Sequence, residues 1–209
     1  MPLLPPKIPI FPLPDVVLFP TVFMPLHIFE PRYREMVRDA LEGDRIIGMV
    51  MLKPGYERGY AGRPDVYPIG CAGLISHTEP LDDGRYNIVL RGLEKFRILG
   101  EERVGGYRLA EVDAVPEPLD ADAQATLRDE RRKLESLLVP LVEGGEQRWP
   151  ANMADDALIN ALSQYLDLEG IERLALLERR DALDRCRGLI ELVEMKLLSM
   201  HHSPSSGLH

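Results

Sequence analysis

The sequence predicts an α+β protein, in which a β-rich small barrel or folded sheet with one helix is followed by a bundle of helices. In the first half, short apolar runs are separated by Gly and Pro, which is typical of short strands in a curved sheet. After the proline- and acid-rich junction PEPLDAD at 116–122, apolar residues recur at helical spacing. We therefore expect a β-rich domain at 1–117, a helical bundle at 118–200 and a disordered tail at 201–209.

The first strands are interrupted by proline. Residues 8–13 and 16–19 are apolar runs, and VFMPLHIF at 22–29 is a further extended run. Proline has no N–H to donate to a strand ladder, so we expect these strands at sheet edges or bends. Pro31 then starts a helix, because proline is favoured at the first helical position, and Gly43 ends it. The apolar face of this helix is formed by Tyr33, Met36, Val37, Ala40 and Leu41.

The remaining strands of the first domain follow from alternation and turn residues. RIIGMVML at 45–52 is a buried run, and IGCAGLISHTEPL at 69–81 is a longer one with glycines where a strand can bulge. Asp82–Gly84 is a hairpin signal, and the half-buried strand that starts at Tyr86 is expected to break at Gly92. Strands at 95–98 and 107–115 complete the set.

Four helices are expected in the second half. The first spans 127–141 and ends at Gly144–Gly145, the second spans 158–166, the third 171–177, and the last 183–200. The last helix carries apolar residues at alternating spacings of three and four. Such a seam usually packs on the helix's own bundle, and a homodimer is the alternative.

Composition restricts the partners and the compartment. The net charge of −9 disfavours nucleic acid and anionic lipid as partners. No apolar run approaches the roughly 20 residues of a membrane helix, so we expect no membrane segment. The N-terminus is a poor export signal, and Cys71 and Cys186 form no framework of pairs. We therefore expect a protein of the reducing cytoplasm.

No motif of a catalytic or cofactor site is present in the sequence. It contains no G-x-x-x-x-G-K-[ST] or G-x-G-x-x-G phosphate loop and no G-x-S-x-G nucleophile elbow. His77, Glu79 and Asp82 match the spacing of no usual metal site and are better explained by a solvated hairpin tip. We therefore expect no catalytic residue, no cofactor and no metal.

The long connection KPGYERGYAGRPDVYP at 53–68 is the most informative candidate for binding. Tyr and Arg are enriched in binding hot spots, and loops on a rigid scaffold often display them. The alternative is a loop without a partner. The residues selected for protein binding are Tyr56, Arg58, Tyr60 and Arg63, with Trp149 beside Pro150 in an inter-helix loop as a weaker addition.

Taken together, several motifs resemble the amino-terminal, substrate-binding domain of Lon proteases, including its stand-alone bacterial versions. They are IPIFPLPDVVLFPTVFMPLHIFEPRYREMVRDAL at 8–41, IIGMVML, IGCAGLI, YNIVLRGLEKFRILGE and LALLERRDALDRCRGLIEL, so the resemblance spans nearly all of 8–198. It implies a PUA-like pseudo-barrel followed by a helical bundle, and a role in recognising proteins or degradation-prone segments. The family's ATPase and Ser–Lys peptidase modules are not part of this sequence, so an enzyme is not expected.

The leading functional hypothesis is a non-catalytic protein-binding module, which acts as an adaptor or in substrate recognition for proteolysis or protein quality control. Its partners would be proteins or unfolded polypeptide segments. One alternative is an RNA-binding PUA-like protein, which the arginine and aromatic residues of the 53–68 loop allow and the acidity disfavours. The other is a small-molecule hydrolase, for which the sequence pairs no nucleophile with a base.

Overall fold

The computed structural model describes residues 4–59, 62–139 and 152–202, and the side chains of these residues except those at 58, 59 and 200–202. The chain divides into two compact units, Met1–Pro116 with Asn160–Glu178 and Glu117–Ile159 with Arg179–His209. Residues 160–178 are thus grouped with the sheet, whereas the sequence assigned all of 118–200 to one bundle. The domain boundaries stay predictions, because compactness does not test whether either part folds alone.

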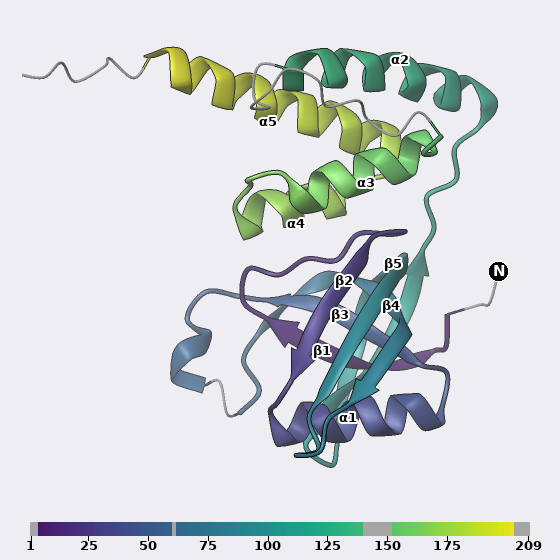
Figure 1. Ribbon diagram of the computed structural model, residues 1–209, viewed down its shortest axis with the longest axis vertical. Coiled ribbons are helices and arrows are strands. Elements are labelled where there is room, and N and C mark those ends of the chain that lie inside the picture. The colour runs from purple at the N-terminus through teal and green to yellow at the C-terminus, as the bar shows by residue number, and fades with distance from the viewer. Residues whose placement is uncertain (1–3, 60–61, 140–151, 203–209) are drawn as a thin grey trace, which may run out of the picture. The chain divides into compact units, whose positions relative to one another are not determined.

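The first unit is built on a mixed sheet that closes on itself (Figure 1). The strand order is β2-β5-β4-β3-β1-β6, and an additional pairing of β5 with β6 closes five strands into a barrel. β2 stays outside the ring and pairs only with the first part of β5. The α+β class expected from the sequence is confirmed. The strands are β1 (Lys7–Leu13), β2 (Phe23–Ile28), β3 (Ile46–Leu52), β4 (Val66–Pro80), β5 (Tyr86–Val104) and β6 (Tyr107–Val115).

The two halves of β1 pair with different neighbouring strands, and each half contains one proline. Lys7–Ile10 pairs with β6, and Ile10–Leu13 pairs with β3. Pro9 lies in the first half and Pro12 in the second, so neither residue needs an N–H for a second ladder. β1 lies between β3 and β6 in the sheet, so the expected edge position is wrong for the strand as a whole, although each proline lies in a half that pairs with a single neighbour.

Two further local expectations are wrong. Residues 16–19 form no strand, although Val17, Leu18 and Phe19 are buried. The Thr21 N–H donates to the Gly92 carbonyl, at 2.9 Å. Gly92 does not break the strand either, since β5 runs through it. A Cβ at Gly92 would lie 2.0 Å from the Phe19 carbonyl oxygen, so glycine is needed for this close approach.

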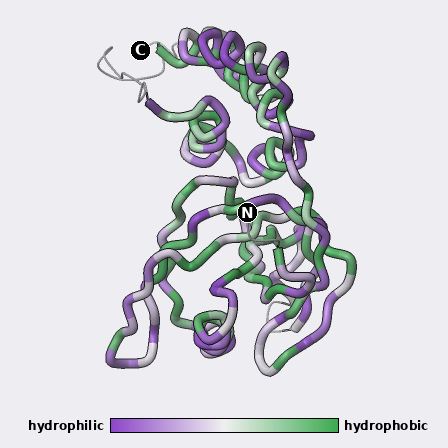
Figure 2. The backbone as a smooth tube through the Cα atoms, turned by 90° about the vertical axis from the view of Figure 1, so that its right-hand side faces the viewer, coloured by the Kyte–Doolittle hydropathy of each residue, from purple (hydrophilic) through white to green (hydrophobic). Residues whose placement is uncertain are grey.

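The helix of the first unit agrees with its sequence signals. Helix α1 (Pro31–Glu42) has Pro31 in its first turn and Gly43 after its end, and it buries Tyr33, Met36, Val37 and Ala40. It contacts β1 and β6 and lies at one end of the barrel (Figure 1). The barrel core contains Ile8, Ile10, Val50, Phe96 and Ala110. Figure 2 shows such hydrophobic residues recurring along the strands and helices.

A helical segment completes the first unit. Helix α3 (Asp155–Tyr165) ends in this unit, and its Tyr165 hydroxyl donates to the Phe23 carbonyl at 2.7 Å. Helix α4 (Gly170–Glu178) begins against the turn that follows β1, where a Cβ at Gly170 would lie 2.7 Å from the Asp15 Cα. These contacts belong to the part of the helical region, Asn160–Glu178, that is grouped with the sheet.

The second unit is formed mainly by α2 (Ala121–Leu138) and α5 (Ala182–His202), which pack together. Burial raises the pKa of the Cys186 thiol, in the seam of α5, to about 12. The predicted seam is buried at Leu183, Cys186, Ile190 and Val193 and half-buried at Leu197, and dimerisation stays a prediction. Residues 201–202 continue α5, residues 203–209 lie outside the described residues, and the expected disordered tail stays a prediction. No helix in the described part of the chain is long and apolar enough to cross a membrane.

Candidate functional site

The loop between β3 and β4 is closed at its base. It leaves β3 after Leu52, forms a short 3-10 turn, η1 (Tyr56–Gly59), and returns to β4 at Val66. The Lys53 N–H donates to the Asp65 carbonyl at 2.9 Å, which joins the two ends of the loop. The loop therefore projects from a fixed base, as loops that carry binding residues often do.

The structure places two of the five predicted binding side chains. Tyr56 is half-buried in η1, and Arg63 is exposed on the returning arm of the loop. The backbone of Arg58 lies in η1, but its side chain is not described. Tyr60 and Trp149 lie outside the described residues. Their role in protein binding stays a prediction.

Arg63 lines a hollow in the first unit that sequence reasoning did not identify. We call it the arginine-lined hollow. Its walls come from β1, the start of α1, the end of β3, the loop and the hairpin between β5 and β6, and its empty volume is ≈ 520 Å³, its open mouth included. The floor is apolar or aromatic and buried, and it consists of Ile10, Pro12, Tyr33, Leu52 and Tyr107. The four arginines that line the hollow are Arg32, Arg63, Arg103 and Arg108.

Arg108 is a structural member of this set. Its side chain is 11% exposed, and its guanidinium donates two hydrogen bonds to the Glu101 carboxylate, at 2.6 and 2.8 Å. A third hydrogen bond goes to the Pro64 carbonyl in the loop, at 2.8 Å. Bidentate, charge-assisted pairs of this kind are strong and directional. Arg108 therefore holds the returning arm of the loop against the barrel.

The other three arginines of the hollow differ in how completely their guanidinium groups are paired with carboxylates. Arg32 pairs with Glu30 at 2.9 Å and lies over the Tyr33 ring, with its guanidinium carbon 4.5 Å from the ring centre. Arg63 makes one long contact of 3.4 Å with Glu101, which Arg108 already occupies. Arg103 is exposed, and among the described residues no hydrogen-bond or ion-pair partner is found for its side chain. Arg63 and Arg103 are thus the cations with free hydrogen-bonding capacity.

Hydrogen bonds to α1 hold the hairpin wall of the hollow in place. The Tyr107 hydroxyl donates to the Asp39 carboxylate at 3.1 Å, and the Gly106 N–H donates to Glu35 at 3.1 Å. Burial and the bond to Asp39 raise the pKa of Tyr107 to about 12, so this hydroxyl keeps its proton. Gly105 has a φ of 54°, which favours glycine at the tip of the hairpin. The hairpin wall of the hollow is therefore fixed to α1.

Sequence reasoning found one wall of this site and missed the others. It assigned Arg32 and Tyr33 only to a helix, and Tyr107 and Arg108 only to a strand. A signal was present, because both places join the residue types that marked the loop, as PRYRE at 31–35 and GYRL at 106–109. The sequence separates these motifs by more than seventy positions, and only closure of the barrel brings them together.

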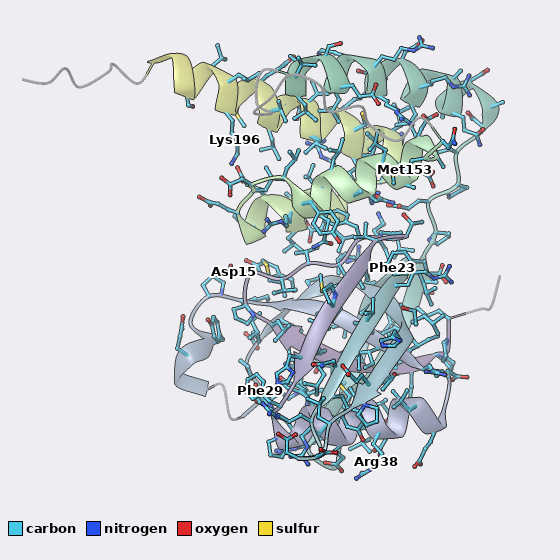
Figure 3. All side chains as sticks on the ribbon, in the orientation of Figure 1. Asp15, Phe23, Phe29, Arg38, Met153 and Lys196 are labelled. Carbon is cyan, nitrogen blue, oxygen red and sulfur yellow. The ribbon has the colours of Figure 1, made fainter. Side chains whose placement is uncertain are left out.

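A second exposed surface lies on the edge strand β2. Phe23 and Phe29 are 52% and 59% exposed, and they lie at opposite ends of the strand (Figure 3). Pro25 has no N–H to offer a further strand, and the Tyr165 hydroxyl occupies the Phe23 carbonyl, so this edge is partly blocked against strand addition. This surface has apolar area but neither a hollow nor an arginine pair, so it offers fewer determinants of recognition.

The arginine-lined hollow presents apolar, aromatic and cationic groups. Its lining contains no Ser, Cys or His side chain that would act as a nucleophile or as a base. Among the residues that the structure describes, no group of three or more His, Cys, Asp or Glu side chains is arranged to hold a metal ion. Glu79, considered above beside His77, instead accepts a hydrogen bond from Asn87 at 2.7 Å.

Comparison with known families gives one match that covers most of the chain. The family model described as the ATP-dependent protease La (LON) substrate-binding domain matches residues 7–195. Two similar curated proteins are Lon protease 2 of Syntrophobacter fumaroxidans, 29% identical over 84% of this chain, and Lon protease 2 of Myxococcus xanthus, 26% identical over 92%. The chain covers only 22% and 24% of the lengths of these relatives.

Solved structures share the fold. The N-terminal domain of a Mycobacterium avium complex Lon protease aligns over 90% of this chain and 98% of its own, with a TM-score of 0.67 and 17% identity. The Lon N-terminal domain protein of Xanthomonas campestris aligns over 88% and 97%, with a TM-score of 0.61 and 24% identity. At these identities, the likeness concerns the fold alone.

Proposed function

The chain belongs to the family of Lon protease substrate-binding domains, and from this membership we propose that it is a non-catalytic module that recognises polypeptide segments for proteolysis or protein quality control. In this role it acts in the cytoplasm as an adaptor or substrate receptor. The full-length relatives are proteases by name, and their substrate-binding part is the part that this chain resembles.

The observation that carries the proposal is the arginine-lined hollow. A buried apolar floor next to arginines with free hydrogen-bonding capacity is the combination found in binding sites, where apolar area gives affinity and a few polar groups give orientation. An unfolded segment can offer single apolar and charged side chains to such a hollow. A folded protein surface does not enter it as easily, because its side chains are already packed.

The proposal is tested with an unfolded protein as the ligand. The 209-residue chain is immobilised, and a small disulfide protein is offered either native or reduced and carboxamidomethylated, so that it cannot refold. We expect the unfolded form to bind and the native form to bind at least about tenfold more weakly. Equal binding of the two forms, or binding of neither, would contradict the proposed function.

A loop variant connects this activity with the hollow. Residues 55–63 are replaced by Gly-Gly, which the hydrogen bond between Lys53 and Asp65 allows without spreading the loop base. We expect this variant to keep its circular dichroism spectrum and to bind the unfolded protein about tenfold more weakly. Unchanged binding would remove the loop and Arg63 from the recognition surface.

A further inference from the structure

We propose that the arginine-lined hollow selects acidic segments of unfolded polypeptides, in which an apolar side chain is flanked by Asp or Glu. This inference rests on the proposed function and specifies the class of segment that is recognised. The apolar side chain lies on the floor formed by Ile10, Pro12 and Leu52, and the flanking carboxylates pair with Arg63 and Arg103.

The preference for acidic residues follows because two arginines of the hollow are already closely paired with carboxylates and two are not. Arg108 and Arg32 are paired with Glu101 and Glu30, at 2.6 and 2.9 Å, and each pair is mostly buried. Glu102, the carboxylate in the lining, is paired with Lys7 at 2.8 Å. The cations left for a ligand are Arg63, which is 53% exposed, and Arg103. A ligand carboxylate gains a charge-assisted hydrogen bond there without breaking a close ion pair.

Two arginines with free donors favour two side-chain carboxylates over the single carboxylate of a chain terminus. Arg63 comes from the loop after β3, and Arg103 comes from the end of β5. An internal segment with an acidic residue on each side of an apolar one supplies a carboxylate for each arginine, whereas a C-terminus supplies only one. The proposed ligand is therefore an internal acidic segment.

The floor favours a polypeptide over RNA as the anionic ligand. Arginines also bind phosphate, but single-stranded RNA is usually recognised by stacking of its bases on exposed aromatic faces. The Tyr33 ring is covered by the Arg32 guanidinium, 4.5 Å from the ring centre, and by Phe11, with ring centres 4.3 Å apart, so it offers no open face for stacking. The net charge of −9 further opposes a long polyanion more than a short acidic segment.

The experiment measures fluorescence anisotropy with the full chain and a labelled, N-acetylated and C-amidated peptide in which a phenylalanine is flanked on each side by two aspartates. We expect binding that weakens as salt is added. A peptide with asparagine in place of aspartate, and the protein variants Arg103→Glu and Arg63→Glu, should each bind about tenfold more weakly. The matched control is Arg91→Glu, an exposed arginine earlier in β5 outside the hollow, which should change affinity less than about twofold.

Each other outcome overturns the inference in a different way. Equal affinity for the asparagine peptide would remove the charge preference, and binding only of a free-acid peptide would assign the hollow to chain termini. Displacement of the peptide by poly(U) at lower concentration than by unlabelled peptide would assign it to RNA. If the unfolded protein binds equally to the wild type and to Arg103→Glu, the proposed function stands and this site fails. If it binds to neither, the proposed function itself fails.

Discussion

In the second compact unit, the Arg185 side chain is fully buried and its guanidinium donates to both oxygens of the Glu117 carboxylate, whereas in the first unit Arg103 is exposed beside the hollow. Arg131 resembles Arg185, since it is 11% exposed and donates to Glu135, Asp155 and the Met153 carbonyl. Arg63 resembles Arg103, with one contact of 3.4 Å.

The difference teaches how to separate structural from recognition arginines in one chain. A buried arginine must have its donors satisfied, because an unmatched buried charge is very unfavourable. The donors of an exposed arginine are hydrated when they have no protein partner, so they stay available to bind a ligand. Stability should therefore depend on Arg185 and binding on Arg103.

The largest effect is expected for Arg185→Met. The substitution deprives the mostly buried Glu117 carboxylate of its arginine, so the free energy of unfolding should fall by about 3–5 kcal/mol. Urea unfolding followed by circular dichroism measures this change. The double variant Arg185→Met with Glu117→Met should recover most of the lost free energy of unfolding. If Arg185→Met alone were as stable as the wild type, Arg185 would not be a structural arginine.

The second-largest effect on stability is expected for Arg108→Ala, because Arg108 is a structural arginine that also lines the binding hollow. It loses three hydrogen bonds to Glu101 and Pro64, so we expect a loss of about 1.5–3 kcal/mol in urea unfolding. Binding of the acidic peptide should also weaken, because the loop arm is no longer held. Arg108→Lys keeps the charge but not the bidentate geometry, and it should behave more like Ala than like Arg.

A smaller effect is expected at the start of α5, where Asp181 accepts a hydrogen bond from the Asp184 N–H at 2.9 Å. Burial by itself would raise the pKa of Asp181, but this bond and the Arg180 guanidinium outweigh it, and the pKa is lowered. Asp181→Ala should therefore cost about 1 kcal/mol at neutral pH.

The pH dependence of this cap has a definite sign. Because the folded-state pKa is lowered, the contribution of Asp181 is complete above its unfolded pKa of about 3.9 and is lost as pH falls below that value. The stability difference between wild type and Asp181→Ala should shrink in acid. Asp181→Asn, which keeps a capping oxygen, is the control, and a difference that grows in acid would contradict this account.

The smallest effect on stability is expected for Arg103→Ala. An exposed side chain without a partner among the described residues should change the free energy of unfolding by no more than about 0.5 kcal/mol. The same variant should lose affinity for the acidic peptide. A loss of stability as large as that of Arg108→Ala would place Arg103 with the structural arginines.

Local signals in the sequence were sufficient where a short-range rule decides the conformation. Pro31 and Gly43 bound the first helix as expected, and Asp82–Gly84 joins β4 to β5. These features depend on the φ angle of proline and on turns that glycine permits, which act within a few residues. The change from alternating to helical apolar spacing likewise predicted the α+β class.

Tertiary structure decided what depends on residues far apart in the chain. Gly92 interrupts the apolar alternation, so the sequence predicted a break, but the Phe19 carbonyl packs against it and β5 continues. Residues 160–178 read as part of a helical bundle, yet they belong to the compact unit of the sheet.

For the candidate site, too, the sequence determined some features and the tertiary structure decided others. The sequence by itself determined that Arg63 lies in a loop rich in tyrosine and arginine, because composition and turn residues identify such a loop. Only the closed barrel decided that Arg103 and Arg108 from β5 and β6 share a hollow with Arg63, and that Arg108 is matched while Arg103 is not. Ion pairing depends on distances in space between residues that are remote in sequence, and strand pairing across the barrel sets those distances.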